Sequence, residues 1–441
     1  MKGVICVAAL FCVFVSTVKG QGFSSSLTAS KIDSVRSVAC PVCQPPAAST
    51  AQCPACHCEC LRPACPSACP NAERYYADSN GCIKHTCAGR VTIEEKHLVQ
   101  DGQRIFLSGA NTAWVSYGYD FGNSQYQYRR NQFIQRLDLV KNAGGNSMRT
   151  WVHIHGATSP QFDSNSYVTG LDNDGTFLAD FKQYLDDALA RGILIFPTLW
   201  NGAFVKPQWT SRLQGLIKDT SKLQSYLDKA LIPWVKAVKD HPALGGWDII
   251  NEMEGFIKPG QYNSESCFDT RFLQNSGAGW AGQLYTAQEL LRFINWQAEA
   301  ICRADPQALV TAGSWSQNSQ TYQWGKKNLY SDQCLIKAGG KANGILTFYS
   351  THSYAWQGQF GSEAVFNHQF SDYNLYKPLV VAEFSQTKGA GRSAAQLFNY
   401  VYDNGYSGAW IWSDETNAVQ SAGISALNGK NGAGGLVNFP L

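Results

Sequence analysis

The stretch GGWDIINEMEG at residues 245–255 contains a short apolar run that ends in an amide and a carboxyl side chain. The run from Trp247 to Ile250 is too short for a helix, and glycines and polar residues bound it, so it predicts a buried strand. A carboxylate just beyond a buried strand, such as Glu252, is commonly only a solvated end group. The rest of the chain has to decide whether it does chemistry.

The same pattern recurs from residue 91 onward, and helical patterns separate most of the runs. In residues 177–192 the apolar side chains share one face, and Gly192 stands where a C-terminal cap belongs. Residues 286–302 open with Thr286 and Glu289 at the spacing of a capping box. The apolar runs that turn residues bound are 105–111, 144–152, 192–200, 245–251, 308–315, 344–354, 378–384 and 406–412.

Eight buried strands with helices between most of them predict an α/β fold, a (β/α)8 TIM barrel, over residues 91–441. An open doubly wound sheet is the structural alternative. No Gly-rich phosphate loop follows the first strand, so nothing in the sequence supports a nucleotide-binding fold. Before that strand, Asp101-Gly102 lies between apolar runs and predicts a β-hairpin.

The first 20 residues have the pattern of a secretory signal peptide, with Met1-Lys2, an apolar stretch over 4–18 and small or polar residues up to Gly20. A membrane anchor is the alternative, but the stretch is shorter than the ~20 residues that span a bilayer. The formal charge is only +3 and no basic run is present. We therefore expect a secreted, extracellular protein that binds neither nucleic acid nor a membrane.

Residues 21–90 differ from the rest of the chain. They contain no Trp, and ten of the fifteen cysteines fall between Cys40 and Cys87. Such a segment cannot build a core and is expected to be stapled by disulfides, whose pairing the sequence does not assign. A zinc site in CPACHCEC (53–60) is an alternative that an oxidising compartment disfavours. The region is predicted to be a stalk, or a small binding module that uses Tyr75 and Tyr76.

Active sites of such barrels lie at the C-terminal ends of the strands. The residues there include two carboxylates, a permanent cation, amides, a His and several indoles. Indole faces stack on the C–H faces of sugar rings, so the composition predicts a site for a neutral polysaccharide, although Trp151 and Trp410 fit packing equally well. In strand order the residues are Asn111, Trp114, Arg149, Trp151, Trp200, Asn201, Asn251, Glu252, Trp315, His352, Tyr354, Trp356, Glu383 and Trp412.

Glu252 and Glu383 end the fourth and seventh predicted strands, so both are expected to point into one cavity. Hydrolysis of a glycosidic bond needs two such carboxyl groups, one protonated and one ionised. Arg149 and Tyr354 would keep Glu383 ionised as a nucleophile. Apolar neighbours would raise the pKa of Glu252 and make it the proton donor. Secondary or structural roles are expected for the other nearby carboxylates, Asp248, Glu254, Asp414 and Glu415.

Two other kinds of catalytic site find little support in the sequence. The eight His residues are scattered, and His153 with His155 lacks the rest of a metal-ligand set, so no metal is expected. A serine hydrolase would show a G-x-S-x-G elbow, which is missing from the sequence.

In order and spacing, the motifs at the strand ends match a known family. Residues 91–441 resemble glycoside hydrolase family 5, a retaining group with a (β/α)8 barrel, and within it the endo-β-1,4-mannanases of invertebrate animals, particularly molluscs and arthropods. The motifs that carry the resemblance are NSMRTW (146–151), WDIINEMEG (247–255), HSY (352–354), VVAEFSQ (380–386) and AWIWSDE (409–415).

The resemblance implies that Asn251 and Glu252 are the amide and acid/base pair and that Glu383 is the nucleophile. Residues 21–90 fall outside it. Cellulases of the family commonly carry a His at the end of the third strand, where this chain has Trp200-Asn201. That departure weakens a cellulase assignment. The implied supporting residues are Arg149, His352, Tyr354 and Trp412.

We therefore expect a secreted, retaining endo-β-1,4-mannanase that cleaves mannan, glucomannan and galactomannan as a monomer without a cofactor. The alternatives are a β-1,4-glucanase on the same scaffold, a non-catalytic glycan-binding barrel, and an adhesion protein in which the Cys-rich segment carries the function. Glu252 and Glu383 are the expected catalytic residues. The expected substrate-binding residues are Arg149, Asn251, His352, Tyr354, Trp412, Trp114, Trp200, Trp315 and Trp356.

Overall fold

The computed structural model describes residues 74–201 and 207–441. The predicted signal peptide over 1–20, and the part of the predicted Cys-rich region up to residue 73, lie outside the described residues. Within the described ranges, none of the helices combines the length and the apolar character that crossing a bilayer requires.

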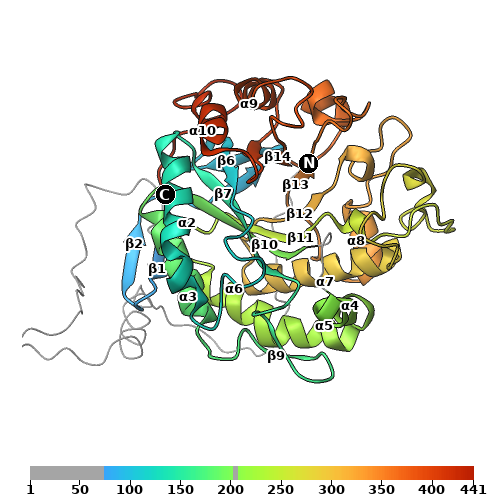
Figure 1. The fold of residues 1–441 in the computed structure, drawn as a ribbon, viewed down its shortest axis with the longest axis horizontal. Coiled ribbons are helices and arrows are strands. Elements are labelled where there is room, and N and C mark those ends of the chain that lie inside the picture. The colour runs from blue at the N-terminus through green and yellow to red at the C-terminus, as the bar shows by residue number, and fades with distance from the viewer. Residues whose placement is uncertain (1–73, 202–206) are drawn as a thin grey trace, which may run out of the picture.

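Eight parallel strands close into a barrel at the centre of the molecule (Figure 1). Each strand pairs with the next along the chain, and the last pairs with the first, which confirms the predicted TIM barrel and excludes the open sheet. Each of the eight predicted runs overlaps a barrel strand. These strands are β6 (Leu107–Asn111), β7 (Ser147–Ile154), β10 (Leu194–Asn201), β11 (Trp247–Asn251), β12 (Val310–Ser314), β13 (Tyr349–His352), β14 (Leu379–Glu383) and β15 (Gly408–Ile411).

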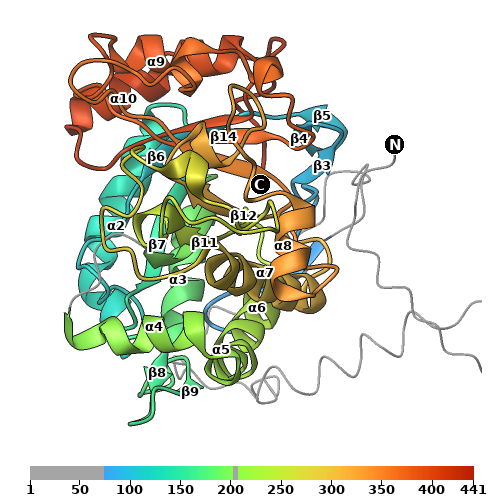
Figure 2. The same cartoon turned by 90° about the vertical axis from the view of Figure 1, so that its right-hand side faces the viewer.

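Helices surround the barrel and bury their apolar faces against it (Figures 1 and 2). Both predicted helices form, and Thr286 with Glu289 makes the predicted capping box at the start of α7. A π-helical segment, η2 (Leu227–Leu231), joins α5 to α6. The helices are α2 (Gln125–Asn142), α3 (Phe177–Leu189), α4 (Thr210–Lys218), α5 (Thr220–Tyr226), α6 (Ile232–Val238), α7 (Ala287–Ala304), α8 (Asp332–Gly339), α9 (Ala394–Asp403) and α10 (Asn417–Ser425).

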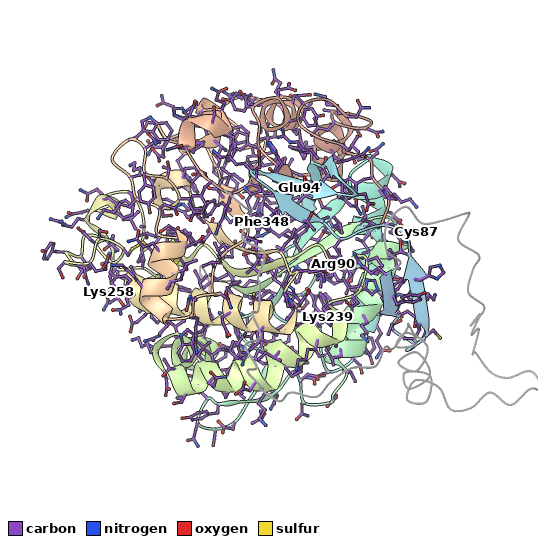
Figure 3. All side chains as sticks on the ribbon, turned by 180° about the vertical axis from the view of Figure 1, so that it is seen from behind. Cys87, Arg90, Glu94, Lys239, Lys258 and Phe348 are labelled. Atoms are coloured by element: carbon purple, nitrogen blue, oxygen red, sulfur yellow. A yellow bond between two sulfur atoms is a disulfide. The ribbon has the colours of Figure 1, made fainter. Side chains whose placement is uncertain are left out.

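A small antiparallel sheet covers the end of the barrel where the strands begin. It consists of β3 (Thr92–Glu94), β4 (His97–Gln100) and β5 (Gln103–Arg104). The turn between β4 and β5 is the predicted hairpin, because Asp101 and Gly102 both have positive φ, as a tight type I′ turn requires. Leu98 of β4 packs with Phe348, and Glu94 and Phe348 are labelled on this side of the molecule in Figure 3.

Part of the predicted Cys-rich region packs on the barrel shell. The hairpin of β1 (Arg74–Ala77) and β2 (Ile83–Thr86) is followed directly by the barrel domain. Tyr76 is buried and lies edge-on against His241, and the backbone N–H of Ser79 donates to Asp186 at 2.8 Å.

Loops between the strands add further local structure at the barrel periphery. Another small hairpin, β8 (Gln161–Phe162) with β9 (Val168–Gly170), lies between β7 and α3. A disulfide joins Cys267 to Cys334 and ties the loop after β11 to α8.

Candidate active site

Glu252 is the first residue after β11 and has a left-handed backbone, with φ of +49°. This conformation is uncommon for a residue with a side chain, and such strain is often found at functional sites. The backbone N–H of Glu252 donates to the carbonyl of Gly313 on β12 at 2.7 Å, which holds the turn in place. The side chain is 13% exposed, so its carboxyl is mostly enclosed but still reaches the surface.

Glu383 is the last residue of β14 and is only 4% exposed. Its Oε1 accepts from Nη1 of Arg149 at 2.6 Å, and its Oε2 accepts from the hydroxyl of Tyr354 at 3.0 Å. Both oxygens therefore have a partner that stabilises negative charge. These are the contacts that the sequence predicted for this carboxylate.

The two carboxyl groups face each other across His352. Its Nδ1 lies 2.6 Å from Oε1 of Glu252 and 3.5 Å from Oε2 of Glu383. One oxygen of each glutamate and a ring nitrogen of His352 all lie within 4.8 Å of one another. Residues far apart in the sequence thus meet because β11 and β14 end at the same rim of the barrel.

Arg149 on β7 bonds to several of the residues that surround the two acids. The side chain has no exposed surface, and its Nε donates to Asp248 at 2.7 Å. Its remaining donors reach Asn111 at 3.0 Å, Asn251 at 2.8 Å and Glu383. Through these contacts Arg149 orients Asp248, Asn111, Asn251 and Glu383. The contact with Glu383 is the one predicted from the sequence, and a direct role of Arg149 in binding substrate stays a prediction.

The two acids have unequal surroundings. Burial raises the pKa of Glu252 to about 7, against the opposing charges of Arg149 and Lys388. Burial also raises the pKa of Glu383, while His352 and Arg149 act against that rise. Only Glu383 has a direct ion pair with Arg149, so we assign the ionised state to Glu383 and the protonated state to Glu252.

Burial lowers the pKa of His352 to about 4. The imidazole is therefore neutral near pH 6 and donates at most one hydrogen to the acid pair. His352 is itself buried, and its predicted role in binding substrate stays a prediction.

Glu254, another carboxylate close to Glu252 in the sequence, does not belong to the acid pair. Glu254 sits in the 3₁₀ turn η3 (Met253–Gly255), because the strand ends before it and the alternation with Glu252 does not continue. Its carboxyl accepts from Ser319, from Tyr330 at 2.9 Å and from the backbone of Trp315 at 3.2 Å. Glu254 thus anchors the loop after β12.

Indole rings flank the acids at the same end of the barrel. Trp114, which is 38% exposed, lies 5.2 Å from Trp151 and 6.2 Å from Trp412 between ring centroids. Trp356 is exposed and lies 6.4 Å from Tyr354. The predicted roles of Trp114, Trp356 and Trp412 in binding a sugar chain stay predictions.

Trp315 forms part of a further aromatic pair beside this end of the barrel. Its ring lies 5.0 Å from that of Trp280, which is exposed. The sequence analysis did not select Trp280, because it stands in a long loop with no strand end to mark it.

The prediction that Trp200 binds substrate is wrong. Its side chain has no exposed surface, and its Nε1 donates to Gln297 of α7 at 3.0 Å. The pairing of β7 with β10 is irregular between Thr198 and Trp200, so Trp200 turns outward to the helices while Thr198 bonds Asp248 inside the barrel. The indole is a core residue and not a sugar platform.

Asn201, by contrast, points into the site. Its Oδ1 accepts from Nδ2 of Asn251 at 3.3 Å, and its own Nδ2 donates to the hydroxyl of Tyr117 at 2.7 Å. Arg149 holds the other end of the Asn251 amide, so that amide is fixed on both sides. The sequence marked Asn201 only as a strand end and missed Tyr117, which lies in a loop without a motif.

Within the residues that the structure describes, Glu252, His352 and Glu383 form the one group spaced so that a metal ion could be shared. The guanidinium of Arg149, 2.6 Å from Glu383, opposes a second positive charge there. We assign no metal to these residues.

Comparison with known proteins shows to which family the chain belongs. No protein-family model matches the chain. A mannan endo-1,4-β-mannosidase of Mytilus edulis is 52% identical over 350 residues, which cover 79% of this chain and 95% of that protein. A mannan endo-1,4-β-mannosidase of Cryptopygus antarcticus is 42% identical over 352 residues, 77% of this chain and 91% of that protein.

The solved structure of the β-1,4-mannanase from the sea hare Aplysia kurodai has a TM-score of 0.78 at 50% identity, covering 80% of this chain and all of that one. Identity at this level over nearly the full length of these relatives extends the likeness well beyond a shared barrel. The chain therefore belongs to the family of mannan endo-1,4-β-mannosidases and is a glycoside hydrolase.

Proposed function

We propose that this protein is a secreted, retaining endo-β-1,4-mannanase of glycoside hydrolase family 5, with Glu383 as nucleophile and Glu252 as acid/base. The observation that carries the proposal is the separation of the two acids, whose nearest oxygens lie within 4.8 Å. Retaining enzymes hold their carboxyl groups about 5–5.5 Å apart, whereas inverting enzymes leave about 6.5–9.5 Å for a water molecule. The close pair supports a double displacement.

In the first step Glu383 attacks the anomeric carbon, and the bond from that carbon to the leaving oxygen breaks. Glu252 gives its proton to this oxygen, so the leaving sugar departs as a neutral alcohol. Arg149 and the hydroxyl of Tyr354 hold Glu383 in line and keep it ionised until it attacks. The Nδ1–H tautomer of His352 donates to Oε1 of Glu252, which leaves Oε2 to carry the proton that is transferred.

In the second step Glu252, now ionised, removes a proton from water, and the water oxygen attacks the anomeric carbon of the ester on Glu383. The sugar is released with its original β configuration. Nδ2 of Asn251 has a second hydrogen that is directed to the hydroxyl next to the anomeric carbon. Trp412, Trp114, Trp315 and Trp356 provide aromatic faces for successive sugar units, as internal cleavage of a chain requires.

The test combines product stereochemistry with substrate preference. Proton NMR of the first product from the wild-type enzyme should show the β anomer, and reducing-sugar release should be faster from mannan and glucomannan than from carboxymethylcellulose. Glu383→Ala should abolish turnover but leave binding of mannan intact. Glu299→Ala, on the outer shell, is the control and should retain full activity.

An initial α anomer would refute the retaining mechanism. Faster release from carboxymethylcellulose would instead establish the glucanase alternative.

A further inference from the structure

Lys388 lies in the loop after β14 and makes no ion pair with a carboxylate in the described part of the chain. Its ammonium instead lies over two aromatic rings, 4.2 Å from the ring centroid of Trp356 and 5.4 Å from that of Tyr354. A cation at these distances is attracted to the ring faces. The site therefore contains a positive charge next to its exposed indole.

The backbone fixes both partners of this contact. The carbonyl of Lys388 accepts from the N–H of Ala355 at 2.8 Å, and its N–H donates to Oγ of Ser385 at 3.1 Å. Trp356 begins a tight turn through Gln357 and Gly358, both with positive φ. The contact of Lys388 with Trp356 thus joins two loops whose backbones are bonded to each other.

The contact also leaves the indole only partly covered. Trp356 is 57% exposed although the ammonium lies over one of its faces. A sugar ring that stacks on Trp356 must therefore use the opposite face. The attraction to Lys388 would hold the indole in one orientation while it does so.

The charge of Lys388 also reaches the proton donor. It lowers the pKa of Glu252, as Arg149 does, against the larger effect of burial. Trp356 follows β13 and Lys388 follows β14, so the pair stands at the rim of the barrel that also carries Glu252. The other groups that face Glu252 are His352 on β13, Glu383 on β14, Arg149 on β7 and Tyr354 after β13.

We propose that Lys388 is a positioning residue for the leaving-group side of the site. It fixes Trp356 as the platform on which the departing sugar stacks, and it places a positive charge beside Glu252. This inference rests on the proposed function, because it requires a leaving sugar and a carboxyl proton donor.

The experiment compares Lys388→Met and Lys388→Arg with Lys341→Met, whose ammonium lies 5.0 Å from the ring of Trp296 on the outer shell. On mannopentaose, Lys388→Met should raise KM about 2- to 5-fold, which corresponds to the loss of one exposed cation–π contact. The alkaline limb of its kcat/KM profile should move to higher pH. Lys388→Arg should restore both properties, and Lys341→Met should change neither.

A second substrate distinguishes loss of the Trp356 platform from general damage to the active site. β-Mannobiosyl fluoride has no leaving sugar, so Lys388→Met should hydrolyse it with an unchanged KM. An equal rise of KM on both substrates, or an unchanged KM and pH profile on mannopentaose, would overturn the role of Lys388. Failure of the wild-type enzyme to cleave mannopentaose would instead refute the proposed function, and the variants would then be compared on the glycan that it does cleave.

Discussion

The unequal burial of the carboxyl groups predicts an unusual property of Glu252→Gln, which should be inactive yet more stable than the wild type at alkaline pH. In the folded protein the pKa of Glu252 is about 7, whereas its ordinary value is 4.5. The contribution of this carboxyl to stability is therefore fully present below pH 4.5 and is lost as the pH rises through about 7. Glutamine remains neutral at every pH and avoids that loss.

The magnitude follows from the size of the shift. A rise from 4.5 to about 7, at 1.36 kcal/mol per pH unit, amounts to about 3 kcal/mol. The free energy of unfolding of Glu252→Gln should exceed that of the wild type by about this amount at pH 8, and by almost nothing at pH 4. Loss of the proton donor should lower kcat/KM on mannan by about 10²- to 10⁴-fold.

The assay is urea denaturation at pH 4, 6 and 8, followed by tryptophan fluorescence, together with kinetics on mannan and on a dinitrophenyl β-mannobioside. The dinitrophenolate leaves without protonation, so Glu252→Gln should retain the first step on that substrate. Glu254→Gln is the matched control, because burial raises its pKa to about 7 as well. It should show the same gain in stability at pH 8 with far less loss of kcat, since Glu254 contacts neither Glu252 nor Glu383.

A stability difference between Glu252→Gln and the wild type that stays constant from pH 4 to pH 8 would refute the reasoning. It would mean that the carboxyl is solvated in the folded protein and is not poised as an acid. Equal losses on mannan and on the dinitrophenyl substrate would show that Glu252 is not the proton donor.

Two further predictions concern Arg149 and Trp200. Arg149→Lys cannot keep all four side-chain partners of the guanidinium, so urea denaturation should show a loss of about 3 kcal/mol or more, and kcat should fall steeply; unchanged stability would contradict the positioning role. Trp200→Phe leaves Oε1 of Gln297 without its partner, so stability should fall by about 1–3 kcal/mol while KM for mannan stays constant. A KM raised more than about threefold would return Trp200 to the substrate site.

The sequence alone predicted the barrel well, because turn residues bound its strands and several of them, such as β10 and β14, are mainly apolar on both faces. A run such as PLVVAEF (378–384) has one stable place, a strand between a packed interior and a layer of helices. The acid pair was predictable for the same reason, since strand ends share one rim. The hairpin at Asp101-Gly102 was predictable because few residue pairs adopt its backbone.

The errors arise where local geometry departs from the regular strand. Period-two alternation would place Thr198 and Trp200 on the same face, but the irregular pairing with β7 sends them to opposite sides. Nothing in the sequence marks this irregularity. Glu254 would share the face of Glu252 if β11 continued, but the left-handed residue at 252 ends that strand.

Contacts between distant loops were the hardest to predict, in contrast to the contacts of Arg149 and Tyr354 with Glu383 at the strand ends. Lys388 and Ala355 are joined by a backbone hydrogen bond that no sequence spacing reveals. Tyr117 and Asn201 likewise meet only through the folded barrel.

The close approach of the two acids also explains how one glutamate serves as acid and then as base. Burial is the main cause of the raised pKa of Glu252, and the charge of Glu252 also raises the pKa of Glu383; because the interaction of two charges is mutual, ionised Glu383 helps to hold the proton on Glu252. When Glu383 becomes an ester, its charge disappears while that of Arg149 remains. The pKa of Glu252 then falls because the nearby negative charge is lost, and the protein requires no movement of the side chain to convert the acid into the base of the second step.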